Sequence, residues 1–296
     1  MRARLGSFLP KISLPRLGPN LGPMLGLRVS GVDARALRGR ALLTFLVKGL
    51  LPVTVLGLVL FTATAPVEAP VVEVAGQASP TLVWPVFYVK TEQKAVALTF
   101  DISWGTKTPY LVLPVLERTN QKATFFLSGP WTARNPEIAK AIAAAGHEIG
   151  SHGDRHDNLS TLNRTGVEQN ISKAHADLKQ VMGLEPRFFR PPNGDYDDIV
   201  VDIAKTLGYE TIIWSVDSLD WKNPGVSTMI SRVTKLAFPG AIILFHASDS
   251  SRETHLALPE TIQTLRDAGY KIVTLGELWK MGTPGRDDPR GRPTKN

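Results

Sequence analysis

The most informative absence in this chain of 296 residues is that of cysteine. Without thiols the protein has no disulfide bonds, no thiolate nucleophile and no zinc site built from cysteine. The absence leaves the cellular compartment open, because it agrees with both oxidising and reducing surroundings. Catalytic or metal-binding chemistry must therefore rely on carboxylates, hydroxyls and the imidazoles of the six histidines.

The main part of the chain also lacks an excess of charge of either sign. The formal net charge is +7, but eight of the 34 Lys and Arg residues lie in residues 1–40, where the only acid is Asp33. The remaining residues comprise 26 basic and 26 acidic ones. A surface for nucleic-acid phosphates is therefore not expected, and the basic excess belongs to an N-terminal tail.

Long hydrophobic runs are absent except for one, which follows the basic tail directly. Residues 41–66, ALLTFLVKGLLPVTVLGLVLFTATAP, contain a single charged residue, Lys48. A membrane helix needs about 20 mostly apolar residues, so residues 41–64 are predicted to form a transmembrane anchor. The basic tail, residues 1–40, would stay in the cytoplasm, and the rest of the chain would lie outside the cell membrane.

A cleaved signal peptide is the competing interpretation of the same run. The charge-free part from Leu50 is nearer in length to the core of a signal peptide, and the small residues ATA at 63–65 resemble a cleavage site. The protein would then be secreted rather than anchored. Pro66 is an awkward residue to follow a cleavage site, and a basic leader of 40 residues is long, which favours the anchor.

Beyond the hydrophobic run the sequence changes character twice. Residues 65–93 carry scattered Pro, Ala, Val and Gly without helical periodicity and are predicted to be a linker. Residues 94–281 alternate short β-rich runs with amphipathic stretches, which is typical of an α/β domain with parallel strands. Residues 282–296 are predicted to be a flexible polar tail.

Seven runs in the α/β region are predicted to be strands. They are AVALTF (95–100), ATFFLS (123–128), HEIGS (147–151), RFFR (187–190), ETIIWS (210–215), AIILF (241–245) and KIVTL (271–275). Amphipathic stretches such as NPEIAKAIAAAG and PETIQTLRDAG are predicted helices, each ending at a Gly before the next strand. Seven such units suit a closed or nearly closed barrel better than an open sheet, so the predicted fold is a distorted (β/α)7-type barrel.

Reactive side chains follow most of the predicted strands. They are Asp101, His152, His156, Arg190, Asp217, Asp220 and His246. All of them fall at carboxyl ends, the rim on which barrels of this kind build active sites. A single His or Asp at a strand end is most often solvated or a cap, whereas several complementary groups on one rim indicate an active site.

The two histidines of SHGDRH suggest a metal. His152 and His156 have the spacing H-x-x-x-H, and both imidazoles could share a divalent ion if the segment formed a helical turn. Metalloproteases of the H-E-x-x-H type place a Glu base directly after the first His, but here that position is Gly153. The base must therefore come from elsewhere.

An acid and a base are available on the same rim. Asp101 is the best candidate for the base, with Arg190 able to keep it ionised. His246 could donate a proton if a carboxylate such as Asp220 held its other nitrogen. A metal, a carboxylate base and an imidazole acid together indicate metal-assisted hydrolysis of a carbonyl compound.

Five ordered motifs resemble those of the polysaccharide deacetylases that have a NodB homology domain, carbohydrate esterase family four. They are TFDISWG, SHGDRH, RPPNG, DSLDW and IILFH, and the resemblance covers roughly residues 94–281. It implies a NodB-type barrel that removes N-acetyl groups from a polysaccharide with one divalent metal ion, either zinc or, alternatively, cobalt or manganese.

The resemblance also implies a role for each matching residue. Asp101 would be the catalytic base, steadied by Arg190, and His246 would be the acid with Asp220 as its partner. His152 and His156 would be the metal ligands. The substrate would be bound by three further residues: Asn193, near whose backbone amide the oxyanion would lie, Trp221 as a groove wall, and Leu244 in the acetyl pocket.

Two positions depart from the family pattern. The second Asp of the first motif, a metal ligand in the family, is Ile102, and the usual aromatic residue of the third motif is Asn193. Successive side chains of a strand face opposite ways, so position 102 can reach the metal only if the chain turns directly after Asp101; we expect such a turn. Because two imidazoles hold an ion less firmly than two imidazoles and a carboxylate, a glycan-binding pseudoenzyme of the same fold remains an alternative to an active deacetylase, as does another metal hydrolase.

The details of two motifs resemble one branch of the family. FDISWG and FHAS are similar to the PdaB-like sporulation branch, whose members carry an N-terminal membrane anchor. The resemblance implies peptidoglycan, a cell-wall glycan, as the substrate. It agrees with the anchor predicted over residues 41–64.

Overall fold

The computed structural model describes residues 84–291. The predicted basic tail, the hydrophobic run at 41–64 and most of the predicted linker lie outside the described residues. Within residues 84–291, no helix has both the length and the apolar character needed to cross a membrane.

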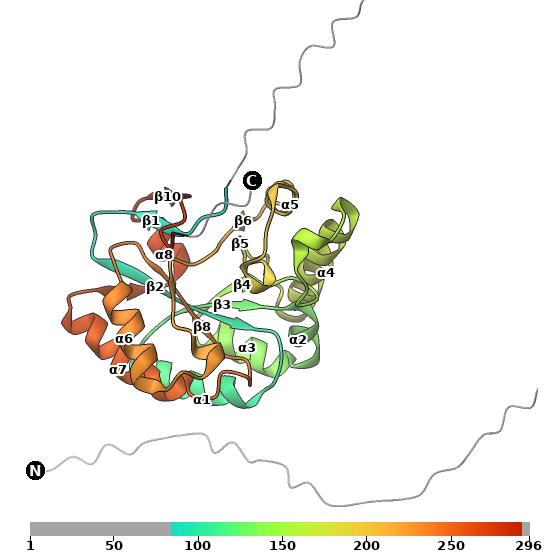
Figure 1. Cartoon of the computed structure of the whole chain (residues 1–296). Helices are drawn as coiled ribbons and strands as arrows, with labels where there is room; N and C mark the ends of the chain where they lie inside the picture. Colours follow the sequence, from blue (N-terminus) through green and yellow to red (C-terminus); the bar gives the residue numbers. More distant parts are fainter. Residues whose placement is uncertain (1–83, 292–296) are drawn as a thin grey trace, which may run out of the picture. The chain divides into compact units, whose positions relative to one another are not determined.

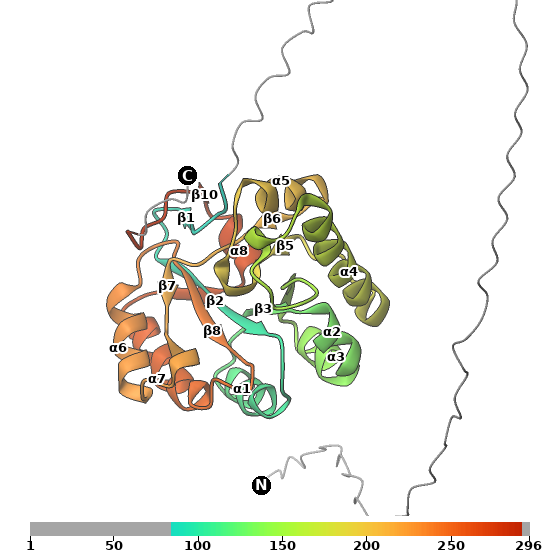
Figure 2. The same ribbon diagram turned by 45° about the vertical axis from the view of Figure 1, so that its right-hand side comes forward.

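A curled sheet of parallel strands forms the centre of the domain, and helices surround it (Figures 1 and 2). The strand order is β6-β5-β4-β3-β2-β8-β7, and β9 also pairs with β2. The strands are β2 (Ala95–Ile102), β3 (Thr124–Leu127), β4 (Glu148–Ser151), β5 (Phe188–Phe189), β6 (Glu210–Thr211), β7 (Val216–Asp217), β8 (Ile242–His246) and β9 (Lys271–Val273). Since all pairings are parallel, the carboxyl ends of these strands meet on one rim.

The helices alternate with the strands along the chain. They are α1 (Lys107–Arg118), α2 (Gly129–Arg134), α3 (Pro136–Ala144), α4 (Arg164–Met182), α5 (Asp198–Thr206), α6 (Val226–Leu236), α7 (Thr254–Asp267) and α8 (Leu275–Trp279). Three short 3-10 helices, η1 (Leu159–Thr161), η2 (Pro192–Gly194) and η3 (Asp220–Lys222), lie in loops. Local signals fix several ends: α8 begins at a capping box between Thr274 and Glu277, and α4 ends at Gly183 in the left-handed conformation.

The central strand β2 separates the apolar core from the site. Its residues Val96, Leu98, Phe100 and Ile102 are fully buried in one apolar cluster, together with residues of α1, α3 and α7. The alternate residue Asp101 instead reaches the buried guanidinium of Arg190. The period of two in a strand thus places apolar side chains under the helices and the carboxylate on the opposite face.

Each of the seven runs predicted to be strands contains a strand, but the barrel is not closed. The two ends of the strand order, β6 and β7, do not pair with each other, so the sheet is curled and open. The run at 210–215 was expected to be one strand, whereas β6 ends at Thr211 and β7 begins at Val216. Between them the chain crosses toward β8, where the backbone N–H of Ser215 donates to the carbonyl of Ile242 at 3.0 Å.

The folded domain extends past both boundaries expected from the sequence. Strand β1 (Tyr88–Lys90), in the predicted linker, pairs antiparallel with β10 (Thr283–Gly285), in the predicted polar tail. Val86 also bridges to Ile212 next to β6, so the N-terminal segment covers part of the open edge of the sheet. Strands of three residues are too short to be distinguished from a linker by composition.

Candidate active site

A pocket of about 490 Å³ opens at the carboxyl ends of the strands. Its lining comes from strand ends and loops that are far apart in the sequence, and it includes most of the residues singled out above. They are Asp101, Trp104, His152, His156, Asn193, Trp214, Asp217, Trp221, Leu244, His246 and Ser250. Arg190 and Asp220 do not line the pocket but hold residues that do.

Asp101 is held by a buried arginine. Arg190 Nη1 donates to Asp101 Oδ1 at 2.8 Å and to Thr99 Oγ1 at 2.9 Å, and the guanidinium stacks over the ring of Phe126 with 4.1 Å to its centroid. Burial alone would raise the pKa of Asp101, but the positive charge of Arg190 and its hydrogen bond outweigh burial and lower the pKa below its ordinary value. Asp101 is therefore ionised at neutral pH and able to accept a proton.

His152 and His156 face each other beside this carboxylate. Their ring centroids are 5.4 Å apart, and His152 Nε2 lies 3.7 Å from Asp101 Oδ2. Burial lowers the pKa of His152 to about 4 and also lowers that of His156, so both rings are neutral at neutral pH. The expected helical turn is not what brings the rings together, since residues 152–156 are not helical and Gly153 has a φ of 73°.

His246 and Asp220 form the second pair. His246 Nδ1 donates to Asp220 Oδ1 at 2.7 Å, and Asp220 Oδ2 accepts hydrogen bonds from the His246 backbone N–H and from Thr254 Oγ1, each at 2.7 Å. Burial alone would lower the pKa of His246, but the charge and hydrogen bond of Asp220 outweigh it and raise the pKa. With Nδ1 engaged and its side chain 20% exposed, His246 offers Nε2 to the pocket as a proton donor.

The predicted substrate-binding residues also line the pocket. Leu244 is buried on β8, Trp221 is 47% exposed on η3, and Asn193 lies in η2 with a φ of 59°. Asn tolerates this left-handed conformation better than most residues, and its amide donates to Asn158 Oδ1 at 2.8 Å. The position that is usually aromatic in the family therefore serves a tight turn in this chain.

Four further residues line the pocket: Trp104, Trp214, Asp217 and Ser250. The sequence places Asp217 on this rim without a role and leaves two alternatives open for each tryptophan, stacking on a sugar ring or packing in the core. Trp104, 43% exposed, packs edge-on against His156 with 5.0 Å between ring centroids. Its position three residues after Asp101 was the sequence feature that placed it near the site. Ser250 had none, because a serine in a polar loop resembles any solvated residue.

The expectation that the chain turns directly after Asp101 is wrong. Strand β2 continues through Ile102, which pairs with Leu127 of β3. The Ile102 side chain is fully buried in the apolar cluster with Phe100 and does not line the pocket. The reason is the alternation of β2, which turns position 102 toward the helices.

The residues present fit a divalent metal in part. The carbonyl of Arg190 accepts a hydrogen bond from His152 Nδ1 at 2.8 Å, which leaves the lone pair on His152 Nε2, as in many metal-ligating histidines. His156 supplies a second neutral imidazole. In the described part of the chain, however, no group of three or more His, Asp or Glu side chains is arranged to hold an ion. The donor set is thus two imidazoles without the family's second carboxylate.

Comparison with known proteins shows to which family this chain belongs. A family model described as polysaccharide deacetylase matches residues 88–212. A peptidoglycan-N-acetylglucosamine deacetylase of Bacillus cereus is 37% identical over 194 residues, which cover 64% of this chain and 90% of that protein. The chain belongs to the polysaccharide deacetylase family.

Other relatives of this chain include a protein described as a pseudoenzyme. The uncharacterised protein YlxY of Bacillus subtilis is 35% identical, and the match covers 66% of this chain and 60% of YlxY. The crystal structure of wild-type BA3943 from Bacillus anthracis, described as a family-four pseudoenzyme, is 35% identical with a TM-score of 0.62, covering 66% of this chain and 68% of that one. A mutant of BA3943 is described as having restored enzymatic activity. The family therefore includes both deacetylases and a pseudoenzyme.

Proposed function

We propose that this protein removes N-acetyl groups from a cell-wall glycan of the peptidoglycan type. One observation carries the proposal: Asp101 and His246 face one pocket, and each is held by a buried partner that shifts its pKa toward the state it needs. The Arg190 charge keeps the base ionised, and the Asp220 charge favours the protonated acid. Environments that separate two pKa values in this way are typical of general acid–base catalysis.

The hydrolysis would use these groups in turn. Asp101 takes a proton from a water molecule as the water oxygen bonds to the acetamide carbon, and the backbone amide near Asn193 stabilises the charge on the carbonyl oxygen. His246 then gives its proton to the sugar nitrogen as the carbon–nitrogen bond breaks. The products are acetate and a free amino group on the sugar.

His152 and His156 would hold a divalent ion such as zinc, cobalt or manganese. When bound, the ion supplies polarisation of the carbonyl and of the attacking water. His152 is oriented for this by its hydrogen bond to the Arg190 carbonyl, so the same arginine positions both the base and one ligand.

Two exposed tryptophans support a sugar polymer as the substrate. Trp104 and Trp221 lie on different loops of the pocket, and both expose more than two fifths of their surface. Exposed aromatic rings at the edge of a pocket offer apolar faces to the C–H groups of sugar rings. Leu244 would then contact the acetyl methyl group.

A glycan-binding pseudoenzyme is the second candidate, and Ile102 favours it. The side chain in the place of the family's second Asp is a hydrocarbon buried in the core, so the ion would have only two histidines as protein ligands. The similarity to BA3943 supports the same candidate.

Acetate release distinguishes the two candidates. The full-length protein is incubated with peptidoglycan and with short N-acetylglucosamine chains, without metal and with added Zn²⁺, Co²⁺ or Mn²⁺. We expect release that depends on the added ion. Glycan binding without any acetate under all four conditions would reject the deacetylase and leave the pseudoenzyme.

We also propose that the protein acts outside the cell membrane, anchored by residues 41–64, in spore formation. The support for the anchor is the order of a basic tail and a hydrophobic run in the sequence. The support for spore formation is the form of the FDISWG and FHAS motifs.

A further inference from the structure

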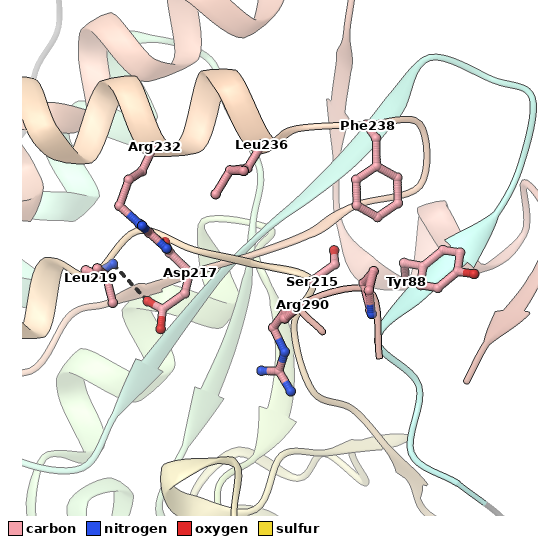
Figure 3. Close-up of a pocket in the computed structure, with 9 residues that line it drawn as sticks. Tyr88, Ser215, Asp217, Leu219, Arg232, Leu236, Phe238 and Arg290 are labelled. Atoms are coloured by element: carbon pink, nitrogen blue, oxygen red, sulfur yellow. Dashed lines mark hydrogen bonds between the residues drawn. The ribbon is translucent and has the colours of Figure 1, made fainter. Parts of the chain in front are cut away.

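A second cavity, of about 650 Å³, lies next to the catalytic pocket and shares Asp217 with it (Figure 3). It runs along β7, the edge strand of the sheet, between α6 and the segment that follows β10. It is lined by Tyr88, Ser215, Asp217, Leu219, Arg232, Leu236, Phe238, Pro289 and Arg290. None of these residues except Asp217 belongs to the catalytic pocket.

Arg232 is a cation of this cavity whose two terminal nitrogens donate no hydrogen bond within residues 84–291. Its Nε donates to the backbone carbonyl of Asp217 at 3.0 Å, and no ion pair joins it to a carboxylate of residues 84–291. Arg290, by contrast, forms two hydrogen bonds of 2.7 Å with the carboxylate of Asp288. The Arg232 guanidinium is thus held at Asp217 by one nitrogen while its positive charge stays available.

Asp217 supplies the only acidic side chain among the described residues that line this cavity. Its carboxylate keeps its negative charge, but its Oδ1 accepts the backbone N–H of Leu219 at 2.8 Å and it forms no ion pair with Arg232. Helix α6 contains no acidic residue, and Lys235 follows Arg232 by three positions. The terminal nitrogens of Arg232 can therefore donate to an anionic group of a ligand.

The opposite end of the cavity is apolar. Tyr88 and Phe238 pack edge to face there, with 5.5 Å between ring centroids, whereas Leu236 lines the cavity next to Arg232 on α6. Figure 3 shows the two rings on the far side of Ser215 from Arg232. A ligand that fits would carry a negative charge next to the catalytic pocket and an apolar portion beyond it.

We infer that this cavity receives a carboxylate-bearing substituent of the sugar next to the one that is deacetylated, and that Arg232 binds the carboxylate. The inference rests on the proposed function, because it places a glycan in the catalytic pocket. Peptidoglycan-type glycans carry lactyl or peptide carboxylates on alternate sugars, and the two cavities are neighbours that share Asp217 as a lining residue. Hydrogen bonds from arginine to a carboxylate are charge-assisted and stronger than neutral ones.

Binding of two matched glycans to the full-length protein tests the inference. One is a neutral N-acetylglucosamine chain, and the other is a peptidoglycan fragment with the same number of sugars and free lactyl carboxylates. Wild type should bind the second about tenfold more tightly, the effect of one charge-assisted hydrogen bond. Arg232→Gln should remove this preference yet keep the affinity for the neutral chain, which also shows that the variant is folded. Arg134→Gln, at the exposed end of α2 and outside both cavities, should keep the preference.

Two results would overturn the inference while sparing the proposed function: equal affinity of wild type for the two glycans, and a preference that survives Arg232→Gln. Failure of wild type to bind either glycan would overturn the proposed function together with the inference. Measuring at two salt concentrations adds a further requirement, because the preference should weaken as salt screens the charge.

Discussion

Asp101 and Asp220 are both buried carboxylates, and their partners give them different tasks. Asp101 is paired with an arginine that cannot give up its proton, so the negative charge stays on Asp101. Asp220 is paired with a histidine, and its own charge raises the pKa of that ring. Two carboxylates of one rim thus produce a base at Asp101 and an acid at His246.

Removal of the base should affect the rate far more than the binding of the glycan. Asp101→Asn should lower kcat for acetate release by about 10²- to 10⁴-fold, because a positioned base acts on the transition state. The dissociation constant for the glycan should stay nearly unchanged. The matched control is Asp202→Asn on α5, where the carboxylate pairs with Arg164 at the surface. Wild-type activity in the Asp101 variant would show that the base lies elsewhere.

The pH dependence should report the partner of the acid. His246 is active while protonated, so the rate should fall as the pH rises through its pKa, which lies above the ordinary 6.5. In Asp220→Asn the charge that raises this pKa is gone and burial lowers it, so the alkaline limb should move to lower pH. A pH profile of kcat measures this. An unmoved limb in the variant would assign it to another group.

At the scale of elements, strand β2 determines what position 102 can do. Its alternation sends Thr99 and Asp101 to Arg190 and sends Phe100 and Ile102 into the core. A carboxylate at position 102 would therefore enter the apolar cluster instead of the pocket. Ile102, which stands in the place of the family's second Asp, therefore lets β2 pack well against the core.

Ile102→Asp should destabilise the fold without tightening metal binding. An unpaired carboxylate in an apolar core should lower the free energy of unfolding by about 3 kcal/mol or more, compared with about 1 kcal/mol for the control Ile102→Val. Denaturant unfolding measures the first effect, and competition with a chromophoric chelator measures the second. Clearly tighter metal binding in the Asp variant would mean that the chain turns after Asp101 when an ion is bound.

Local sequence patterns predicted where the strands lie better than they predicted whether the barrel closes. Runs of β-branched and aromatic residues located strands such as β2 and β8, because buried parallel strands need such runs. The strand β7 was missed because the run at 210–215 was expected to be one strand that ends before Val216. The open edge between β6 and β7 depends on long-range packing of the segment around Val86, which no local pattern encodes.

Which residues share the candidate site was predictable from the sequence, but the direction of each side chain was not. The carboxyl ends of parallel strands meet on one rim, so Asp101, His152 and His246 could be grouped before their distances were known. The direction in which a side chain points at the last residue of a strand could not be predicted in the same way. Position 102 was misplaced because a strand that continues for one more residue turns it to the other face.

At the scale of the whole molecule, the proposal concerns which side of the membrane the folded domain occupies. Protease added to intact protoplasts should remove residues 84–291 and spare the basic tail at 1–40, because positively charged flanks stay in the cytoplasm. Immunodetection with one antibody to each part measures this. A soluble mature form that begins near residue 66 would instead establish a cleaved signal peptide.

The central claim is that this protein breaks the carbon–nitrogen bond of an N-acetyl sugar with Asp101 as the base. Its most direct test measures acetate and free glycan amino groups together, in one incubation of the full-length protein with peptidoglycan and a divalent metal. We expect both products in equal amounts from wild type, and about 10²- to 10⁴-fold slower release of each from Asp101→Asn. Glycan that binds wild type but yields neither product with any added metal would contradict the claim.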